Sequence, residues 1–102
     1  MPQQVQGLTT AEGGGSGEVL VRWAQNPELD VVSYTVFRAT TSGGALTRIG
    51  SASRQEVTQF EFAPFVDSSA TVAFYRVRAV DSAGQEGPLS VERCGASVGY
   101  SC

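Results

Sequence analysis

Histidine and lysine are both absent from this chain of 102 residues. Without histidine the chain cannot build a Ser-His-Asp triad, a Cys-His dyad or a histidine metal site. Without lysine it lacks the phosphate-binding lysine of a P-loop and the amine that forms a Schiff base. The two absences therefore exclude most of the common catalytic arrangements. No cofactor is expected either.

Positive charge is also scarce. Seven arginines stand against ten acidic residues, and the formal net charge is −3. A nucleic-acid-binding domain or a peripheral membrane protein usually carries a basic patch, so we expect neither kind of partner. No apolar run approaches the ~20 residues of a membrane span, and the first residues lack the charged start and apolar block of a signal peptide. The chain is then either cytosolic or a piece of a longer protein.

Only two cysteines are present, Cys94 and Cys102. They are too few for a disulfide-rich scaffold, and they have no partners for a four-ligand zinc site. A small disulfide between them is the simplest use, with Gly95 and Gly99 permitting the bend, and it would favour an oxidising compartment. The alternatives are a free Cys102 or a bond between chains.

The hydrophobic pattern predicts an all-β domain. No stretch shows helical spacing over three turns, whereas short alternating segments rich in Val, Thr, Phe and Tyr recur between Gly, Pro and Ser clusters. Length and composition fit one small domain. Seven strands are expected, over Gln4–Thr10, Glu18–Gln25, Val31–Thr40, Leu46–Ala52, Val57–Val66, Ala73–Asp81 and Leu89–Arg93.

Alternation also predicts which faces are buried. Val19, Val21 and Trp23 share one face of the second segment. The third places Val32, Tyr34 and Val36 together, and the sixth places Tyr75, Val77 and Ala79 opposite two arginines. Short strands of this number and spacing indicate a two-sheet antiparallel sandwich, whose inward faces meet around Trp23 and the tyrosines.

The residues resemble the fibronectin type III family, particularly its bacterial modules, which are seven-stranded immunoglobulin-like antiparallel β-sandwiches. The resemblance covers roughly Pro2 to Val91 and rests on the order and spacing of six matching segments. Two regions depart from the family pattern: Gln59–Phe62 is longer and more aromatic, and Cys94–Cys102 lies beyond the family's end. The matching segments are Val5 with Leu8, Val19–Trp23, Leu29–Arg38, Phe65–Asp67, Phe74–Gly84 and Gly87–Ser90.

The resemblance implies structural roles for the large aromatics. Trp23 would be the core tryptophan of the second strand, and Tyr75 the tyrosine of the E-F corner, whose hydroxyl bonds back to the preceding loop. The fibronectin type III domain would span residues 1–93, followed by a C-terminal tail over 94–102. The loop from Asp81 to Gly87 contains no Arg-Gly-Asp, so an integrin-binding role does not carry over.

One outward sheet face is a candidate binding surface. In the family the third and sixth strands are neighbours, so Phe37, Phe74, Arg76 and Arg78 would project together beside Thr35. Aromatic rings stack on sugars or peptides, and arginine adds planar hydrogen bonding. The plainer reading is that these side chains pack across strands on a solvated face or touch a neighbouring domain.

The loop from Asp81 to Gly87 is a second candidate, because loops at the end of a rigid sandwich often carry binding residues. Gln85 and Glu86 would make the contacts. The plainer reading is an ordinary turn of Ser, Ala and Gly.

Carboxylates offer the one remaining route to catalysis. Glycoside hydrolysis needs two of them flanking a cleft, roughly 5 to 10 Å apart. The available acids are scattered through turns and solvated faces, and a thin sandwich offers no cleft, so we do not expect an enzyme. Nor is there a dense acidic loop of the calcium-binding kind. The four acids considered are Glu56, Glu61, Asp67 and Asp81.

The first hypothesis is therefore a non-catalytic spacer or interaction module of a larger extracellular or cell-surface protein, in bacteria often beside a polysaccharide-degrading domain. Its partners would be neighbouring domains, and the chain would be a monomer. The alternative is a specific carbohydrate- or protein-binding domain that uses the Phe37/Phe74/Arg76/Arg78 face.

Overall fold

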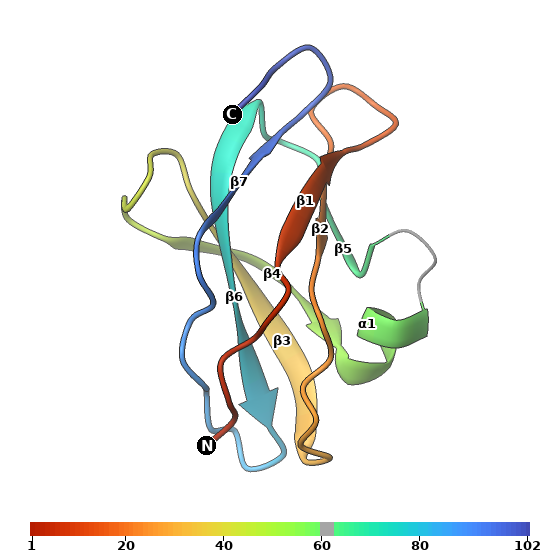
Figure 1. Cartoon of the computed structure of the whole chain (residues 1–102), viewed down its shortest axis with the longest axis vertical. Coiled ribbons are helices and arrows are strands. Elements are labelled where there is room, and N and C mark those ends of the chain that lie inside the picture. Colours follow the sequence, from red (N-terminus) through yellow and green to blue (C-terminus); the bar gives the residue numbers. More distant parts are fainter. Residues whose placement is uncertain (60–62) are drawn as a thin grey trace.

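The computed structural model describes residues 1–59 and 63–102, which form two antiparallel sheets and one short helix (Figure 1). One sheet, called sheet A here, has three strands in the order β1-β2-β5, and sheet B has four in the order β4-β3-β6-β7. The elements are β1 (Thr9–Glu12), β2 (Val19–Arg22), β3 (Val31–Ala39), β4 (Thr47–Ser53), α1 (Arg54–Gln59), β5 (Phe65–Asp67), β6 (Val72–Asp81) and β7 (Arg93–Ala96).

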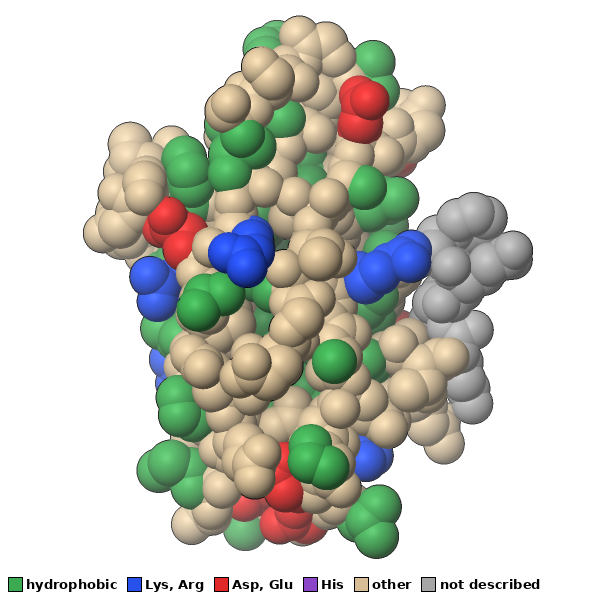
Figure 2. All heavy atoms as spheres, viewed as in Figure 1, with side chains coloured by type: hydrophobic (Ala, Val, Ile, Leu, Met, Phe, Trp, Pro, Cys, Tyr) green, Lys and Arg blue, Asp and Glu red, His purple; other side chains and the backbone are tan. Residues whose placement is uncertain are grey.

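The expected all-β sandwich with seven strands is confirmed. The molecule is elongated, with extents of 40 × 30 × 18 Å, and the two chain ends lie at opposite ends of the long axis (Figure 1). On the face shown in Figure 2, hydrophobic side chains are scattered between polar and backbone atoms.

The core fills the space between the sheets. The burial of β6 alternates strictly, with Tyr75, Val77 and Ala79 inside, as predicted. Trp23 and Tyr34 are buried against each other, with ring centroids 5.6 Å apart. The Tyr34 hydroxyl accepts a hydrogen bond of 2.7 Å from the backbone N–H of Asn26, so its polar end is satisfied inside the core.

Two irregularities in sheet B change which side chains point outward. The register of β3 against β6 shifts between Val31 and Ser33, so Val31 is buried and Val32 is 47% exposed. The prediction that Val32 lies on the face of Tyr34 and Val36 is therefore wrong. The register of β3 against β4 shifts between Val36 and Phe37. A β-bulge of this kind inserts one residue and reverses the alternation beyond it.

Helix α1 was not expected. The predicted strand Val57–Val66 is wrong, because Val57 lies in α1 and β5 starts only at Phe65. Residues 60–62 of that predicted strand lie outside the described residues. The cause is a capping box: the Ser53 hydroxyl accepts from the Glu56 N–H at 3.2 Å, and the Glu56 carboxylate accepts from the Ser53 N–H at 2.8 Å. Such a pair satisfies N–H groups that a helix start leaves without partners.

Both ends of the strand series also differ from the prediction. Strand β1 begins at Thr9 rather than Gln4, because Gly7 has a φ of 72° and interrupts the extended backbone, although Val5 and Leu8 are buried as anchors. The predicted last strand Leu89–Arg93 is also wrong, since β7 covers Arg93–Ala96.

Ser90 explains why the last strand is displaced. It lies beside β6, where its N–H donates to the carbonyl of Val77 at 2.8 Å and its hydroxyl accepts from the Val77 N–H at 2.9 Å. The hydroxyl takes the place of a backbone carbonyl, so this segment follows β6 without forming a regular ladder.

The C-terminal residues are joined to sheet B. Strand β7 crosses the expected division between residues 1–93 and 94–102, since Cys94, Gly95 and Ala96 all pair with β6. Cys94 forms the predicted disulfide with Cys102, with Cα atoms 6.0 Å apart. The bond ties Cys102 to Cys94 of β7, so residues 97–101 form a closed loop beside that strand.

Removing this disulfide should destabilise the domain. In the chain-entropy account, a bridge over so short a loop contributes about 2 kcal/mol. We therefore expect a double replacement, Cys94→Ser with Cys102→Ser, to lower the urea midpoint of unfolding, whereas Ser101→Ala inside the same loop should leave it unchanged. An unchanged midpoint in the double variant would show that the bridge does not constrain the fold.

Candidate functional site

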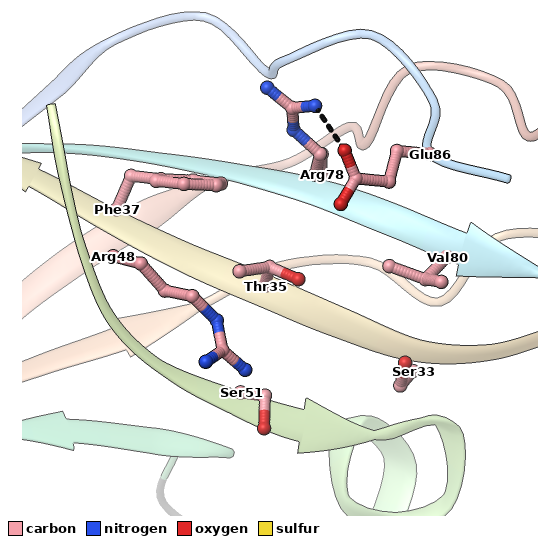
Figure 3. Close-up of a pocket in the computed structure, with 8 residues that line it drawn as sticks. All are labelled: Ser33, Thr35, Phe37, Arg48, Ser51, Arg78, Val80 and Glu86. Atoms are coloured by element: carbon pink, nitrogen blue, oxygen red, sulfur yellow. Dashed lines mark hydrogen bonds and ion pairs between the residues drawn. The ribbon is translucent and has the colours of Figure 1, made fainter. Parts of the chain in front are cut away.

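The outer face of sheet B carries an open groove of about 550 Å³ (Figure 3). Its floor is β3, and its walls come from β4 on one side and from β6 with the following loop on the other. The lining residues are Ser33, Thr35, Phe37, Arg48, Ser51, Arg78, Val80 and Glu86.

Strand pairing places these residues side by side. Thr35 lies between Arg78 of β6 and Ser51 of β4, and Phe37 lies opposite Arg48. Alternation along β3 turns Ser33, Thr35 and Phe37 to the same face. Thr35 is only 8% exposed although it faces outward, so it forms the floor of the groove.

One wall is held by a charged and aromatic cluster. The Arg78 guanidinium lies 5.2 Å from the centre of the Phe37 ring and donates a hydrogen bond of 2.7 Å to the Glu86 carboxylate. Because the Glu86 side chain is 53% exposed, this ion pair adds little stability. Its effect is to fix the position of the Arg78 guanidinium along the groove.

The opposite wall carries a second arginine. Arg48 is exposed, and in Figure 3 its guanidinium points along the groove toward Ser51. Within residues 1–59 and 63–102, the exposed Arg48 side chain makes neither a hydrogen bond nor an ion pair. Arginine presents five N–H donors in a planar fork that matches a carboxylate.

The structure divides the predicted binding residues into two groups. Phe37, Arg78 and Glu86 line the groove together. Arg76 lies next to Phe37 in the pairing but reaches the backbone carbonyl of Ser90 at 3.5 Å. Phe74 lies farther along the same strand, opposite Ala39.

Gln85 also stands apart from the groove lining. Its backbone N–H donates to the Asp81 carboxylate at 2.8 Å, so at this position the loop has the plainer role of a turn.

Sequence reasoning did not include Arg48 and Ser51 in the site. The two residues are three positions apart in the sequence, so simple alternation would put their side chains on opposite faces of the strand. The register shift in β4 inserts one residue between them and turns both toward the groove. Nothing in the alternation of Leu46–Ala52 marks that bulge.

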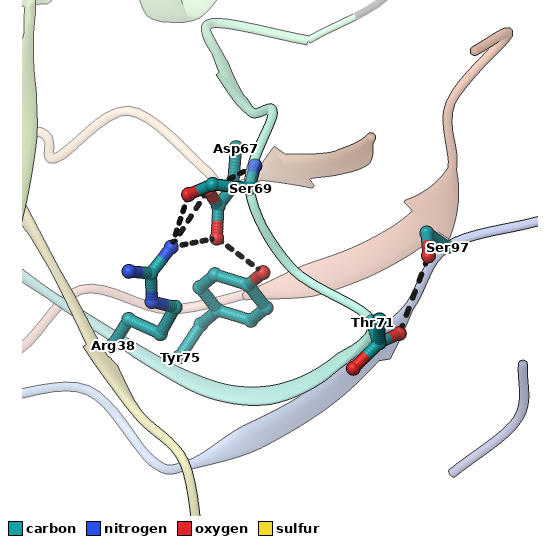
Figure 4. A network of polar contacts seen from close by, with 6 residues as sticks. All are labelled: Arg38, Asp67, Ser69, Thr71, Tyr75 and Ser97. Carbon is teal, nitrogen blue, oxygen red and sulfur yellow. Dashed lines mark hydrogen bonds and ion pairs between the residues drawn. The ribbon is translucent and has the colours of Figure 1, made fainter. Parts of the chain in front are cut away.

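A second polar cluster lies at the opposite side of sheet B and joins the two sheets (Figure 4). Asp67 ends β5 of sheet A and is 5% exposed, whereas Arg38 and Tyr75 belong to β3 and β6 of sheet B. Arg38 donates to both Asp67 oxygens at 2.9 and 2.8 Å, and the Tyr75 hydroxyl donates to one of them at 2.7 Å. Ser69 adds a backbone N–H at 3.3 Å.

These contacts keep the Asp67 carboxylate charged. Burial alone would raise its pKa, but the hydrogen bonds from Arg38, Tyr75 and Ser69 together hold the pKa of Asp67 below its ordinary value. Burial, strengthened by the hydrogen bond to the negative carboxylate, raises the pKa of Tyr75 far above the ordinary range. Tyr75 therefore stays a neutral donor at every physiological pH.

The other predicted carboxylates have separate structural contacts. Asp81 accepts the backbone N–H groups of Ala83 and Gln85 at 3.0 and 2.8 Å, and Glu56 belongs to the capping box. Glu61 lies outside the described residues. No group of three metal-ligating side chains occurs in the described part of the chain. None of the helices there is long and apolar enough to cross a membrane.

The fold is similar to several solved structures. An Fn3-like protein from Clostridium thermocellum superposes with a TM-score of 0.69 at 24% identity, covering 96% of this chain and 95% of that one. The spore cortex lytic enzyme SleM of Clostridium perfringens gives 0.66 at 20% identity, over 91% of this chain and 27% of the enzyme.

A β-1,2-glucanase from Parabacteroides distasonis gives a TM-score of 0.62 at 18% identity, over 96% of this chain and 13% of the enzyme. No family model and no curated protein matches the sequence. At these identities the similarity concerns the fold, which is Fn3-like.

Replacing Asp67 tests the cluster that joins the sheets. Because the folded-state pKa is lowered, the stabilisation is present above the ordinary Asp pKa and is lost as the pH falls through the folded value. We expect Asp67→Asn to lower the free energy of unfolding by about 2 to 3 kcal/mol at neutral pH, with a smaller difference in strong acid.

The matched control is Asp30→Asn, at an exposed acid in the β2–β3 turn. Urea unfolding of both variants and the parent chain from neutral pH down through the Asp range measures the effect. A loss in Asp67→Asn that stays constant across that range would contradict the ionic role.

Proposed function

We propose that this chain is a non-catalytic fibronectin type III module that serves as a spacer or interaction domain in a larger extracellular or cell-surface protein. The arrangement of three and four strands in two facing sheets supports an immunoglobulin-like topology of this family. Similarity over almost the whole of an Fn3-like protein, and over small parts of two larger enzymes, supports the role of a module.

The shape of the molecule suits a spacer. The chain enters and leaves at opposite ends of the 40 Å axis (Figure 1), so flanking segments would be held apart by the length of the domain. Exposed apolar side chains occur near both ends: Leu29 in the β2–β3 turn is 89% exposed, and Tyr100 after β7 is 57% exposed. Such residues can pack against neighbouring domains.

The observation that carries the non-catalytic role is the use of the candidate acids. Asp67, Asp81 and Glu56 are each bound in a different structural contact, and none of them lines the groove. Glu86 does line it but is paired with Arg78. A glycosidase needs two carboxyl groups facing one substrate bond, and within the part of the chain that the structure describes the groove offers one acid, already paired with an arginine.

The disulfide supports a location outside the cytosol, since such bonds persist in oxidising compartments. Two of the similar structures are a spore cortex lytic enzyme and a β-1,2-glucanase. By analogy, the parent protein would carry a domain that degrades a cell-wall or other polysaccharide, with this module as an accessory.

A second role, specific carbohydrate or protein binding, is favoured by the groove itself. An open groove with an aromatic ring, two arginines and three hydroxyl side chains has more recognition chemistry than an inert spacer needs. Of the predicted face, Phe37 and Arg78 would carry this role. Amide shifts confined to the groove on adding an oligosaccharide or peptide are the observation that it requires.

The non-catalytic role is tested by incubating the purified chain with soluble β-1,2-glucan and with peptidoglycan and measuring new reducing ends. We expect no release above that of a heat-unfolded, disulfide-reduced sample of the same chain. Release by the folded chain alone, proportional to its concentration, would contradict the proposal.

A further inference from the structure

We propose that the groove on sheet B binds a glycan that carries carboxylate groups, a polysaccharide containing uronic acids. This inference rests on the second proposed role, oligosaccharide binding, and names the ligand class. Three features of the groove support it (Figure 3): hydroxyl side chains along the lining, Arg78 held in place over the Phe37 ring, and the exposed Arg48 on the opposite side.

The lining favours a sugar over a peptide. Ser33, Thr35 and Ser51 provide hydroxyls that both donate and accept, which matches the hydroxyl groups of a sugar. A peptide bound by a central anchor needs a well-packed apolar pocket, and among the described lining residues Val80 alone is aliphatic, on an open face. A peptide that pairs through its backbone would need the outer edge of β4, an edge strand of sheet B, whereas the groove lies on the face of the sheet between β4 and β6.

The two arginines differ in what they can bind. The charge of Arg78 is matched, because its guanidinium lies over the Phe37 ring and is paired with Glu86, the one acid among the described lining residues, although its buried Nε–H has no hydrogen-bond partner there. Arg48 has no such partner among the described residues and points into the groove. The unmatched positive charge of the groove therefore lies on its β4 side. A carboxylate there would accept two parallel hydrogen bonds from the guanidinium, the geometry that distinguishes arginine from a simple point charge.

The arrangement also fixes the orientation of the ligand. The Glu86 carboxylate on the opposite wall would repel a second acid and would accept a bond from a sugar hydroxyl instead. The carboxylate of a bound sugar ring should thus face β4, with its hydroxyls toward Thr35 and the loop after β6. Phe37 supplies an apolar surface at one end against which a sugar ring can pack.

The test is an amide-shift titration of the isotope-labelled 102-residue chain with three ligands of equal length. They are trigalacturonate, its full methyl ester and neutral galactotriose. We expect trigalacturonate to shift amides of residues 33–37, 48–51 and 78–80, and to bind on the order of tenfold more tightly than its methyl ester. The methyl ester keeps the sugar rings and removes only the charge.

Two variants assign the effect to Arg48. Arg48→Gln should reduce trigalacturonate affinity on the order of tenfold and leave methyl-ester affinity nearly unchanged. The matched control is Arg22→Gln, which removes an exposed arginine from sheet A and keeps the same net charge as the test variant. It should leave both affinities unchanged. Both variants should retain the dispersed amide spectrum of the parent chain.

Several results would overturn the inference, and they separate it from the proposed function. If trigalacturonate and its methyl ester bound the groove equally tightly, the role in oligosaccharide binding would stand, but the claim that the groove recognises a carboxylate would be contradicted. Equal losses in Arg48→Gln and Arg22→Gln would show an effect of net charge only. Groove shifts with a polyglutamate peptide but with none of the trisaccharides would indicate a protein partner. No shifts with any ligand would contradict both the inference and the binding role, and would leave the spacer.

Discussion

The Asp67 carboxylate links the two sheets of this domain by hydrogen bonds. Asp67 comes from the shortest strand of sheet A and receives both Arg38 and Tyr75 from the two central strands of sheet B. A buried charge of this kind is costly unless it is hydrogen-bonded, and here four donor groups are directed at it: the Arg38 guanidinium, the Tyr75 hydroxyl, and the backbone N–H and hydroxyl of Ser69. The apolar core can hold two sheets together without defining how they are aligned, whereas directional bonds restrict the alignment: those of Asp67, and the one from the Thr10 hydroxyl of β1 to the Cys94 carbonyl of β7.

The alignment matters for the outer face of sheet B. The two strands that Asp67 binds from the inside are the same strands that present Thr35, Phe37 and Arg78 on the outside. Along a strand, alternate side chains serve opposite faces, so fixing Arg38 and Tyr75 also fixes their neighbours. The floor of the groove and one of its walls therefore lie on the two strands that Asp67 holds, which suits a surface that must keep its shape.

The sequence predicted those parts of the fold that follow from regular alternation. Strands β3 and β6 were placed almost to their observed bounds, and the disulfide was confirmed. The failures occurred where one residue changes the local geometry: Gly7, the bulge at Val32, and the capping box of Ser53 and Glu56. The last of these carries a readable signal, Ser-x-x-Glu, that a search for hydrophobic periods overlooks.

The candidate site was predictable only in part for the same reason. Phe37 and Arg78 share a face because both strands alternate regularly beside each other. Arg48 and Ser51 face the same groove only because a bulge in β4 lies between them. Gln85 belongs to a turn in which its backbone N–H, rather than its side chain, makes the bond to Asp81. Long-range pairing and bulges are set by the whole sheet, so a single segment does not contain them.

The claim that the hydrogen bonds of Asp67 link the two sheets is tested most directly by a double-mutant cycle of Asp67→Asn and Tyr75→Phe. The free energy of unfolding is measured at neutral pH for the parent chain, both single variants and the double variant. If the two side chains act as one unit, the effects are not additive, and the coupling is about 1 kcal/mol or more. Effects that add to within about 0.5 kcal/mol would contradict the claim that this bond aligns the sheets.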